Sequence, residues 1–567
     1  MRSLYIYFLL ILAGLPFTQL FGGGTVDVRQ FGAIPGDGKD DAVAIRTAIA
    51  SAISNGIGVV RFEAGRYDLM RNQDGNLGGS NGAYFLRVSV PKGGMSIEGA
   101  VDEKGNPATT FMGKSLGEVD QALPTMLRFI DTEEATLRNI IFDWDPWMYS
   151  SGVVTSVDGN RVTVAIRAGH PQIDGMKPYN LGVYDPAAKA YISGRIYTHE
   201  GKSLWRTGST PGTMVLDDER LASRVKPGLW VFWFLSYFAE SVNLHVFRVG
   251  NLVVSNVWMH SANGFGAQVR NVRDAFVDGF RIVPTEGRIA TTTRDGFRFA
   301  LTTGGDLRVT RCHFEGVQDD CQSVYSTHLV VDAITGPRSI VTRDMRTGSV
   351  KSVGVIKGST WGFYGPDKLL SPFQAMVETF SFHAESNRWS ISFNADLPAF
   401  AEPGAVICNI SWAPRSYTLT ETTFVNCNAT GSIIQTHNVF ISNNHYRNMM
   451  EPAVLIGSAT YGEGMPTRNI QIVNNRFENC GVVARYGLNT AIGMGLLGDI
   501  RERTRIENVL IQSNTFRSLK NGGIRIGEAV DVDVTGNDLS DCAANNAVII
   551  ANDRTDRIRI RDNRTAK

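Results

Sequence analysis

The chain has 567 residues, of which 43% are hydrophobic and 20% are charged, with a formal net charge of +1. A length this great excludes one ordinary hydrophobic core, so the chain either divides into domains or stacks repeats. The near-neutral charge excludes the strongly basic footprint of a nucleic-acid-binding protein and gives no strong field for capturing a polyanion. A local basic groove stays compatible with this composition.

Residues 1–22 are expected to form a signal peptide. Arg2 precedes an almost wholly apolar run from Leu4 to Phe17, which is too short to span a membrane and has the length of a signal-peptide core. We expect cleavage between Gly14 and Gly24, and hence a secreted or periplasmic protein. No later stretch reaches roughly 18 uninterrupted apolar residues, so no membrane span is expected.

A helix is predicted from Asp40 to Ile53, in the segment DDAVAIRTAIASAI. Its apolar residues recur with the helical period, and Asp40 and Asp41 suit the positive end of a helix dipole. A helix in this place would cap the first coil of a repeat protein and keep its end soluble.

Internal repeats run through most of the chain. Short alternating apolar strands, each followed by Asn or Gly-Asn, recur at a spacing of roughly 20 to 30 residues, with copies starting at Leu137, Leu252, Leu307, Val439, Ile470, Val509, Val532 and Ile558. Alternation with a period of two indicates strands, and asparagine tolerates the left-handed backbone of a sharp bend. Asparagines stacked at one corner would also hydrogen-bond along the stack. One strand-rich coil per repeat predicts a β-solenoid.

Two stretches interrupt the repeats and are expected to be small β-barrel or sandwich modules, the alternative being long irregular coils. The predicted domains are a signal peptide (1–22), N-terminal coils with a capping helix (23–149), a first inserted module (150–245), central coils (246–328), a second inserted module (329–415) and C-terminal coils (416–567).

Six cysteines are scattered without the CxxC spacing of a zinc site. Export would permit disulfides, but four cysteines end apolar strand-like runs, namely Cys312, Cys427, Cys480 and Cys542. We therefore expect buried free thiols. No cluster of His, Asp and Glu has metal-ligand spacing, so neither a metal nor another cofactor is expected.

The segment from Val26 to Leu69 combines an FGA tripeptide, a DGKDD turn, the expected helix and a V-x-F-x-x-G-x-Y strand. In this order it resembles the opening of the pectate-lyase-like β-helix superfamily. The resemblance implies an all-β fold, a right-handed parallel β-helix with an N-terminal capping helix. It does not decide the reaction, because this fold carries lyases, hydrolases, epimerases and adhesins.

Two later motifs narrow the resemblance. Residues 293–297 read TRDGF and residues 316–321 read GVQDDC, and together they resemble the acidic motifs of inverting β-helix glycosidases in families 28 and 110. Family 110, the α-1,3-galactosidases, is favoured by FDWDP from Phe142, by the GGDLRVTRCHFEG run before the acid pair and by AVLIGSATYGEG from Ala453.

The resemblance to family 110 covers most of residues 26–540. The chain departs from that family at residues 323–328, SVYSTH, where its members commonly show a V-H-G element. This departure leaves the identity of the substrate open.

The aspartates of these motifs are spaced for a shared site. Asp295 precedes Asp319 and Asp320 by 24 and 25 residues, about one coil, and equivalent positions on neighbouring strands lie about 4.8 Å apart. A bend between Asp319 and Asp320 would let both face the cleft. Like charges this close keep one carboxyl protonated, which supplies an acid together with a base. The resemblance implies that Asp319 is the general acid and that Asp295 and Asp320 activate a water.

Sugar rings stack on aromatic faces and hydrogen-bond planar polar side chains. Candidate substrate-binding residues are Arg294, Arg298, Tyr325, His328, Trp144, Tyr461 and Glu463. The resemblance thus implies a secreted, exo-acting, inverting α-1,3-galactosidase-like hydrolase whose partner is a carbohydrate.

Three other functions stay open. A polygalacturonase-like hydrolase would need a Gly-His-Gly coil and an Arg-x-Lys, and the nearest candidate, Arg525-Ile526-Gly527, lacks the lysine. A polysaccharide lyase or epimerase would need an acidic calcium cluster or a Lys or Arg base. A non-catalytic glycan-binding solenoid predicts that the three aspartates can be replaced without loss.

Overall fold

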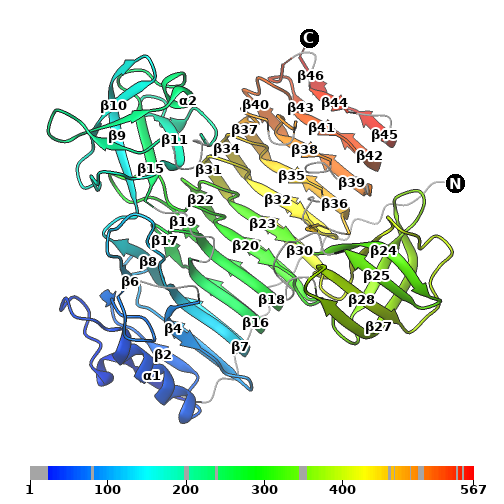
Figure 1. Cartoon of the computed structure of the whole chain (residues 1–567), viewed down its shortest axis with the longest axis horizontal. Helices are drawn as coiled ribbons and strands as arrows, with labels where there is room; N and C mark the ends of the chain where they lie inside the picture. The colour runs from blue at the N-terminus through cyan, green and yellow to red at the C-terminus, as the bar shows by residue number, and fades with distance from the viewer. Residues whose placement is uncertain are drawn as a thin grey trace.

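A computed structural model shows a right-handed parallel β-helix with two β modules projecting from it (Figure 1), which confirms the predicted all-β fold. The structure describes residues 23–77, 82–196, 203–235, 241–343, 354–457, 462–464, 466–484, 487–495, 504–543, 547–551 and 555–566. The expected signal peptide lies outside these residues. Among those described, no helix has the length and apolar character needed to cross a membrane.

Each coil contributes up to three parallel strands, which stack into three rows. The first row comprises β4 (Tyr84–Val88), the first halves of β7 (Thr125–Arg138), β16 (Val242–Ser255) and β18 (Phe265–Asp278), then β20 (Phe297–Ala300), β23 (Gln322–Tyr325), β32 (Ser432–Gln435), β35 (Val454–Ile456), β38 (Ile492–Met494), β41 (Ile524–Ile526) and β44 (Val548–Ile550).

The second row shares one continuous sheet with the first, because the three long strands run through both. It comprises β1 (Thr25–Asp27), β2 (Val59–Arg61), β5 (Gly94–Glu98), the second halves of the long strands, then β21 (Asp306–Thr310), β30 (Ser416–Thr420), β33 (Val439–Ser442), β36 (Arg468–Val473), β39 (Ile506–Gln512), β42 (Ala529–Thr535) and β45 (Asp556–Arg561).

The third row is a separate sheet. Its strands are β3 (Gly65–Leu69), β6 (Thr109–Lys114), β8 (Ile140–Asp145), β17 (Trp258–Met259), β19 (Arg281–Ile282), β22 (His313–Glu315), β31 (Thr423–Cys427), β34 (His445–Met449), β37 (Arg476–Cys480), β40 (Thr515–Arg517), β43 (Asp538–Leu539) and β46 (Arg564–Thr565).

The predicted asparagine ladder is present at the corner between the second and third rows. Each side-chain amide nitrogen donates to the side-chain oxygen of the next residue at 2.9 to 3.0 Å, through Asn444, Asn475, Asn514, Asn537 and Asn563. The left-handed backbone belongs to the residue before each step, as at Asn443 and Asn474, with φ of 56° at both. In these two coils one asparagine makes the bend and the next joins the coils, and Ser513, Gly536 and Asp562 make the bend in the following coils.

Stacked aromatic rings and thiols fill the interior. Ring centroids in the third row lie 4.4 to 5.2 Å apart along Phe314, Phe424, Tyr446, Phe477 and Phe516. All six cysteines are buried and free, as predicted. Stacking of like rings on successive coils adds to the apolar burial that holds the solenoid together.

The predicted capping helix is α1 (Ala42–Ser54). It buries Ile45, Ala48 and Ile49 against the first coils, at the spacing of one helical face. Asp41 does not cap the helix with its side chain; its two carboxyl oxygens instead accept the backbone N–H groups of Ile34 and Asp68. The carboxyl therefore links the helix to the solenoid.

The two insertions differ in architecture. The first is a seven-stranded antiparallel sheet with a short helix α2 (Glu219–Ala222), made of β9 (Tyr149–Asp158), β10 (Arg161–Ile166), β11 (Tyr179–Asp185), β12 (Ala190–Tyr191), β13 (Arg206–Thr207), β14 (Thr213–Asp217) and β15 (Trp230–Phe234). The second closes into a barrel made of β24 (His328–Gly336), β25 (Ser339–Arg343), β26 (Thr360–Tyr364), β27 (Leu370–His383), β28 (Arg388–Phe393) and β29 (Val406–Asn409).

The two insertions lie at opposite edges of the first row: one at the N-terminal ends of its strands and the other at their C-terminal ends. The inserted sheet follows β8 of the third row and precedes β16, whereas the barrel follows β23 directly. Figure 1 shows the two modules on either side of β20, β23 and β32. The turns that enter β20 and β23 therefore lie beside the inserted sheet.

Candidate active site

Three buried aspartates meet at the turns that enter β20 and β23. Asp295, Asp319 and Asp320 are 4%, 6% and 6% exposed, and one carboxyl oxygen of each lies within 4.8 Å of the others. Asp295 and Asp320 occupy equivalent positions on neighbouring coils, since the N–H of Gly296 donates to the carbonyl of Asp320 at 2.9 Å. Asp319 and Asp320 lie in a bend rather than a strand. The predicted convergence of the three carboxyls is confirmed.

Asp295 is the carboxyl whose environment favours a proton. Burial is the main cause that raises its pKa, and the charge of Asp319 acts in the same direction. Arg298 and Arg294 oppose this rise, as does a hydrogen bond from the hydroxyl of Ser323 at 2.8 Å. The cluster therefore contains one carboxyl whose surroundings favour its protonated form.

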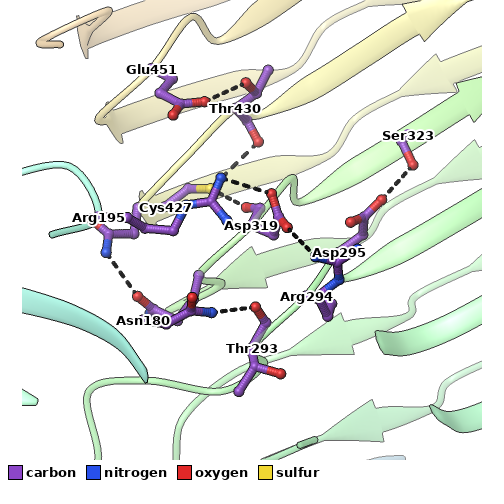
Figure 2. A network of polar contacts seen from close by, with 12 residues as sticks. Asn180, Arg195, Thr293, Arg294, Asp295, Asp319, Ser323, Cys427, Thr430 and Glu451 are labelled. Atoms are coloured by element: carbon purple, nitrogen blue, oxygen red, sulfur yellow. Dashed lines mark hydrogen bonds and ion pairs between the residues drawn. The ribbon is translucent and has the colours of Figure 1, made fainter. Parts of the chain in front are cut away.

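Two arginines contact Asp319 from different parts of the chain. Arg195, from the inserted sheet, lies 3.1 Å from one carboxyl oxygen, and Arg294, from the solenoid turn, lies 3.7 Å from the other. Figure 2 shows both guanidinium groups beside the Asp319 carboxyl. Arg195 and Asp319 are each only 9% exposed at the side chain, so the attraction between them is weakly screened by solvent.

Arg298 links the carboxyl cluster to the loop after β35. Its guanidinium lies 3.9 Å from Asp295, forms a salt bridge with Glu463 and lies 4.5 Å from the ring centroid of Tyr325. Glu463 also bridges to the backbone of Thr327, just before the barrel. Four of the predicted site residues, Arg294, Arg298, Tyr325 and Glu463, are therefore gathered around the aspartates.

The other predicted substrate-binding residues have different positions. His328 is 3% exposed at the start of β24, where its N–H donates to the carbonyl of Gly462, so it borders the loop that carries Glu463. Tyr461 lies outside the described residues. Trp144 is a core residue, 2% exposed, whose indole N–H donates to Asn243 at 2.9 Å. The prediction that Trp144 binds substrate is wrong, because its ring faces the solenoid interior.

The inserted sheet also holds the backbone of the site. The side-chain amide of Asn180 donates to the carbonyl of Thr293, two residues before Asp295. The hydroxyl of Tyr191 donates to the carbonyl of Ile289 and accepts a hydrogen bond from Gln318, the residue before Asp319. Both aspartate-bearing turns are therefore braced by the same module that supplies Arg195.

Sequence reasoning missed Arg195, Asn180 and Tyr191. They belong to a segment without repeats and lie 100 residues or more from the aspartates in the chain, so neither period nor motif connects them to the site. A salt bridge across such a distance is set by tertiary packing alone.

The prediction that no acidic cluster has metal-ligand spacing is wrong, because oxygens of the three carboxyls lie close enough together to hold a metal ion. The arginines next to them already supply positive charge, at 3.1 and 3.7 Å from Asp319 and 3.9 Å from Asp295. Part of the negative charge of the cluster is therefore balanced by these arginines.

Fold and site together define a parallel β-helix protein with a buried three-carboxyl site. Comparison with known proteins adds a similarity, at low sequence identity, to curated α-1,3-galactosidases. The chain is 23% identical over 523 residues to α-1,3-galactosidase B of Akkermansia muciniphila, a match that covers 88% of this chain and 64% of that protein. It is 22% identical over 480 residues to α-1,3-galactosidase A of Shewanella woodyi, covering 80% and 76%.

The chain thus spans less than two thirds of the length of the Akkermansia relative. No protein-family model matches the chain. Among solved structures it is similar to an exopolygalacturonase from Thermotoga maritima, with 10% identity, a TM-score of 0.41 and coverage of 97% and 93%. It is also similar to the surface adhesin PfbA of Streptococcus pneumoniae, with 10% identity, a TM-score of 0.43 and coverage of 96% and 98%.

Proposed function

We propose that the protein is an exported glycoside hydrolase that removes terminal α-linked galactose from glycans, acting from the chain end with inversion. The observation that carries this proposal is the cluster of Asp295, Asp319 and Asp320, whose carboxyl oxygens lie within 4.8 Å of one another, in a chain related to α-1,3-galactosidases. Glycoside hydrolysis needs one carboxyl as acid and another as base, and this cluster offers both.

In the proposed reaction Asp319 protonates the oxygen of the scissile bond, and Asp295 with Asp320 removes a proton from the attacking water. Three carboxyls this close titrate as one set that retains a proton more readily than separate groups would. Arg195 and Arg294 favour the charged form of Asp319 in the free site. The role of Asp319 as proton donor therefore rests on the family resemblance, and it makes a prediction of its own below.

The stereochemistry is a separate part of the proposal. Inverting enzymes commonly hold their two carboxyls about 6.5 to 9.5 Å apart to admit a water, and retaining enzymes about 5 to 5.5 Å apart. One oxygen of each carboxyl lies within 4.8 Å of the others, and the resemblance to family 110 favours inversion. Direct observation of the first-formed anomer decides between inversion and retention.

A lyase or epimerase is less well supported by the arginines of the site. Such an enzyme needs an unprotonated base beside the sugar ring. Arg298 is held in its charged form: burial acts to lower its pKa, but Tyr325, Glu463 and Asp295 raise that pKa well above its usual value. A guanidinium stabilised by carboxylates binds hydroxyls or carboxylates and does not accept protons.

The first test is hydrolysis of α-1,3-galactobiose followed by proton NMR, with Asp319→Asn and Asp396→Asn for comparison. Asp396 is an exposed aspartate of the barrel, paired with Arg338, so it controls for the loss of one carboxyl. We expect β-galactose to form first, activity to fall by about a thousandfold in Asp319→Asn, and Asp396→Asn to match the wild type. Formation of α-galactose first would establish retention, and no release by the folded wild type would contradict the proposed activity.

A second experiment, with an activated substrate, tests which aspartate donates the proton. Nitrophenyl α-galactoside has a leaving group that departs without protonation, so a variant that lacks only the general acid recovers much of its rate on this substrate. We expect Asp319→Asn to recover at least tenfold relative to galactobiose, and Asp295→Asn and Asp320→Asn to stay inactive on both. Recovery in Asp295→Asn instead would move the acid to the carboxyl that burial protonates.

A further inference from the structure

A strip of polar side chains that includes three arginines runs along the first row and ends at the carboxyl cluster. In register on neighbouring strands lie Arg128 of β7, His245 of β16, Gln268 of β18 and Arg298 of β20. Arg270 lies two residues after Gln268 and therefore faces the same side of the sheet. The strip faces outward, because the residues that flank each member in its strand, such as Leu127 and Phe129 around Arg128, are fully buried.

The charges of this strip act on one another. The pKa of His245 is lowered to about 3, first by burial and then by the charges of Arg128 and Arg270. Arg128 packs over the ring of Tyr84, with 5.2 Å to its centroid, and forms no ion pair within the part of the chain that the structure describes. Arg87 of β4 lies beside Arg128 on the next coil. Positive charge therefore accumulates along this part of the sheet.

On the C-terminal side of Arg298, the next coils of the first row present mainly apolar residues. Beyond Arg298 the same register position is occupied by Ser323, Ile433 and Leu455, and Ile433 and Leu455 belong to a small buried apolar cluster. Further along the same register position, Gly493 of β38 is followed by Arg525 of β41, five strands beyond Arg298. A glycan that lies across the first row next to the carboxyls therefore meets arginines within three strands on the side of β7 and an apolar surface on the side of β32 and β35.

We infer that the natural substrate is an anionic glycan, with a sulfate ester or a carboxylate on a sugar that binds over β7 and β16. This inference rests on the proposed function and specifies its substrate class. Arg298 and Arg128 are three strands apart, roughly 14 Å at about 4.8 Å per strand, which is the span of a short oligosaccharide. An anionic group at that distance from the terminal galactose would meet Arg128, and a guanidinium binds both sulfate and carboxylate oxygens in pairs.

The test compares three probes: a neutral α-1,3-galactosyl oligosaccharide, the same oligosaccharide with a sulfate ester a few sugars from the terminal galactose, and one with a uronic acid there. The variants are Arg128→Gln and, as control, Arg308→Gln. Arg308 is exposed on β21 of the second row, so its replacement removes the same charge from a different face. Binding is measured by calorimetry in the Asp319→Asn background, and hydrolysis in the otherwise wild-type protein.

We expect at least one anionic probe to bind about tenfold more tightly than the neutral probe, the effect of one charge-assisted contact. Arg128→Gln should abolish this preference, and Arg308→Gln should keep it. A preference for only the sulfated or only the uronic probe identifies the anion. Equal binding of all three probes, or a preference unchanged by Arg128→Gln, overturns the inference, even if galactose is released. Binding of an anionic probe without any hydrolysis contradicts the proposed function and leaves the inference standing.

Discussion

At the scale of single residues, the arginines around the site differ in how closely they contact each of the three aspartates, and these contacts affect which carboxyl holds a proton. Asp319 has two arginine neighbours, whereas Asp295 is buried with its nearest cation, on Arg298, 3.9 Å away. A buried carboxyl with a distant counter-charge holds its proton to higher pH than a paired one. Each arginine is therefore a control on the pH range in which the cluster has both an acid and a base.

Replacement of Arg298 by Gln tests this control. The charge of Arg298 lowers the pKa of Asp295 against the effect of burial, so its removal raises that pKa further. Since the base must be ionised, the acidic limb of kcat/KM should move to higher pH by about one unit. The same profile for Arg308→Gln should overlay that of the wild type. An acidic limb that stays in place in Arg298→Gln would show that the profile does not report Asp295.

At the scale of elements, the solenoid is held by ladders that cross from coil to coil. Asn475 accepts from the side chain of Asn444, donates to Asn514 and also donates to the carbonyl of Ile441, all within 3.0 Å. It is 1% exposed, so water cannot replace these partners. A buried amide in this position is costly to remove and has little freedom to move.

Asn475→Ala should lower the free energy of unfolding by about 2 to 3 kcal/mol, because the carbonyl of Ile441 and the amide partners lose their hydrogen bonds in the interior. Denaturant unfolding followed by circular dichroism measures this loss. Gln471→Ala is the matched control, since Gln471 is an exposed residue of β36 in the same coil. Equal midpoints for the two variants would show that the ladder does not stabilise the stack.

The coils, the capping helix and the presence of two insertions followed from residue patterns, whereas the contacts that the insertions make with the solenoid did not. The coils and the meeting of Asp295 with Asp320 follow from strand period and a separation of one coil. Trp144 was predicted to bind substrate, although the alternation of its strand already indicated a core position. Ile140, Phe142 and Trp144 all point to the interior and are buried. Arg195 had no such signal, because its contact with Asp319 depends on how the inserted sheet packs against the solenoid.

At the scale of the whole molecule, the fold buries all six cysteines as free thiols. Burial raises the pKa of Cys312, Cys408, Cys480 and Cys542 to about 12. Reactive thiols are thiolates that solvent can reach, and these are neither. Packing of the stack therefore protects these thiols from oxidation in the folded protein.

We expect none of the six thiols to react with a thiol reagent such as DTNB in the native protein, and all six to react after unfolding without reductant. The native protein should also unfold at the same temperature with and without reductant. Cys321 and Cys427 lie beside each other and are therefore the two thiols best placed to form a disulfide. A count of four thiols after unfolding would indicate a disulfide between them.

Strand β23 pairs with one strand that is close in the sequence and with another that is far away in it. Gln322 pairs with Phe297, 25 residues earlier, and with Ser432, 110 residues later, at the same strand spacing. The spacing between neighbouring strands therefore does not depend on how many residues connect them. The barrel is inserted between β23 and β32 in the sequence, and the two strands still pair directly. Catalysis and recognition can then diverge independently. Loops can be lengthened, exchanged or trimmed to suit a new glycan while the distance between the carboxyls is preserved by hydrogen bonds in the sheet.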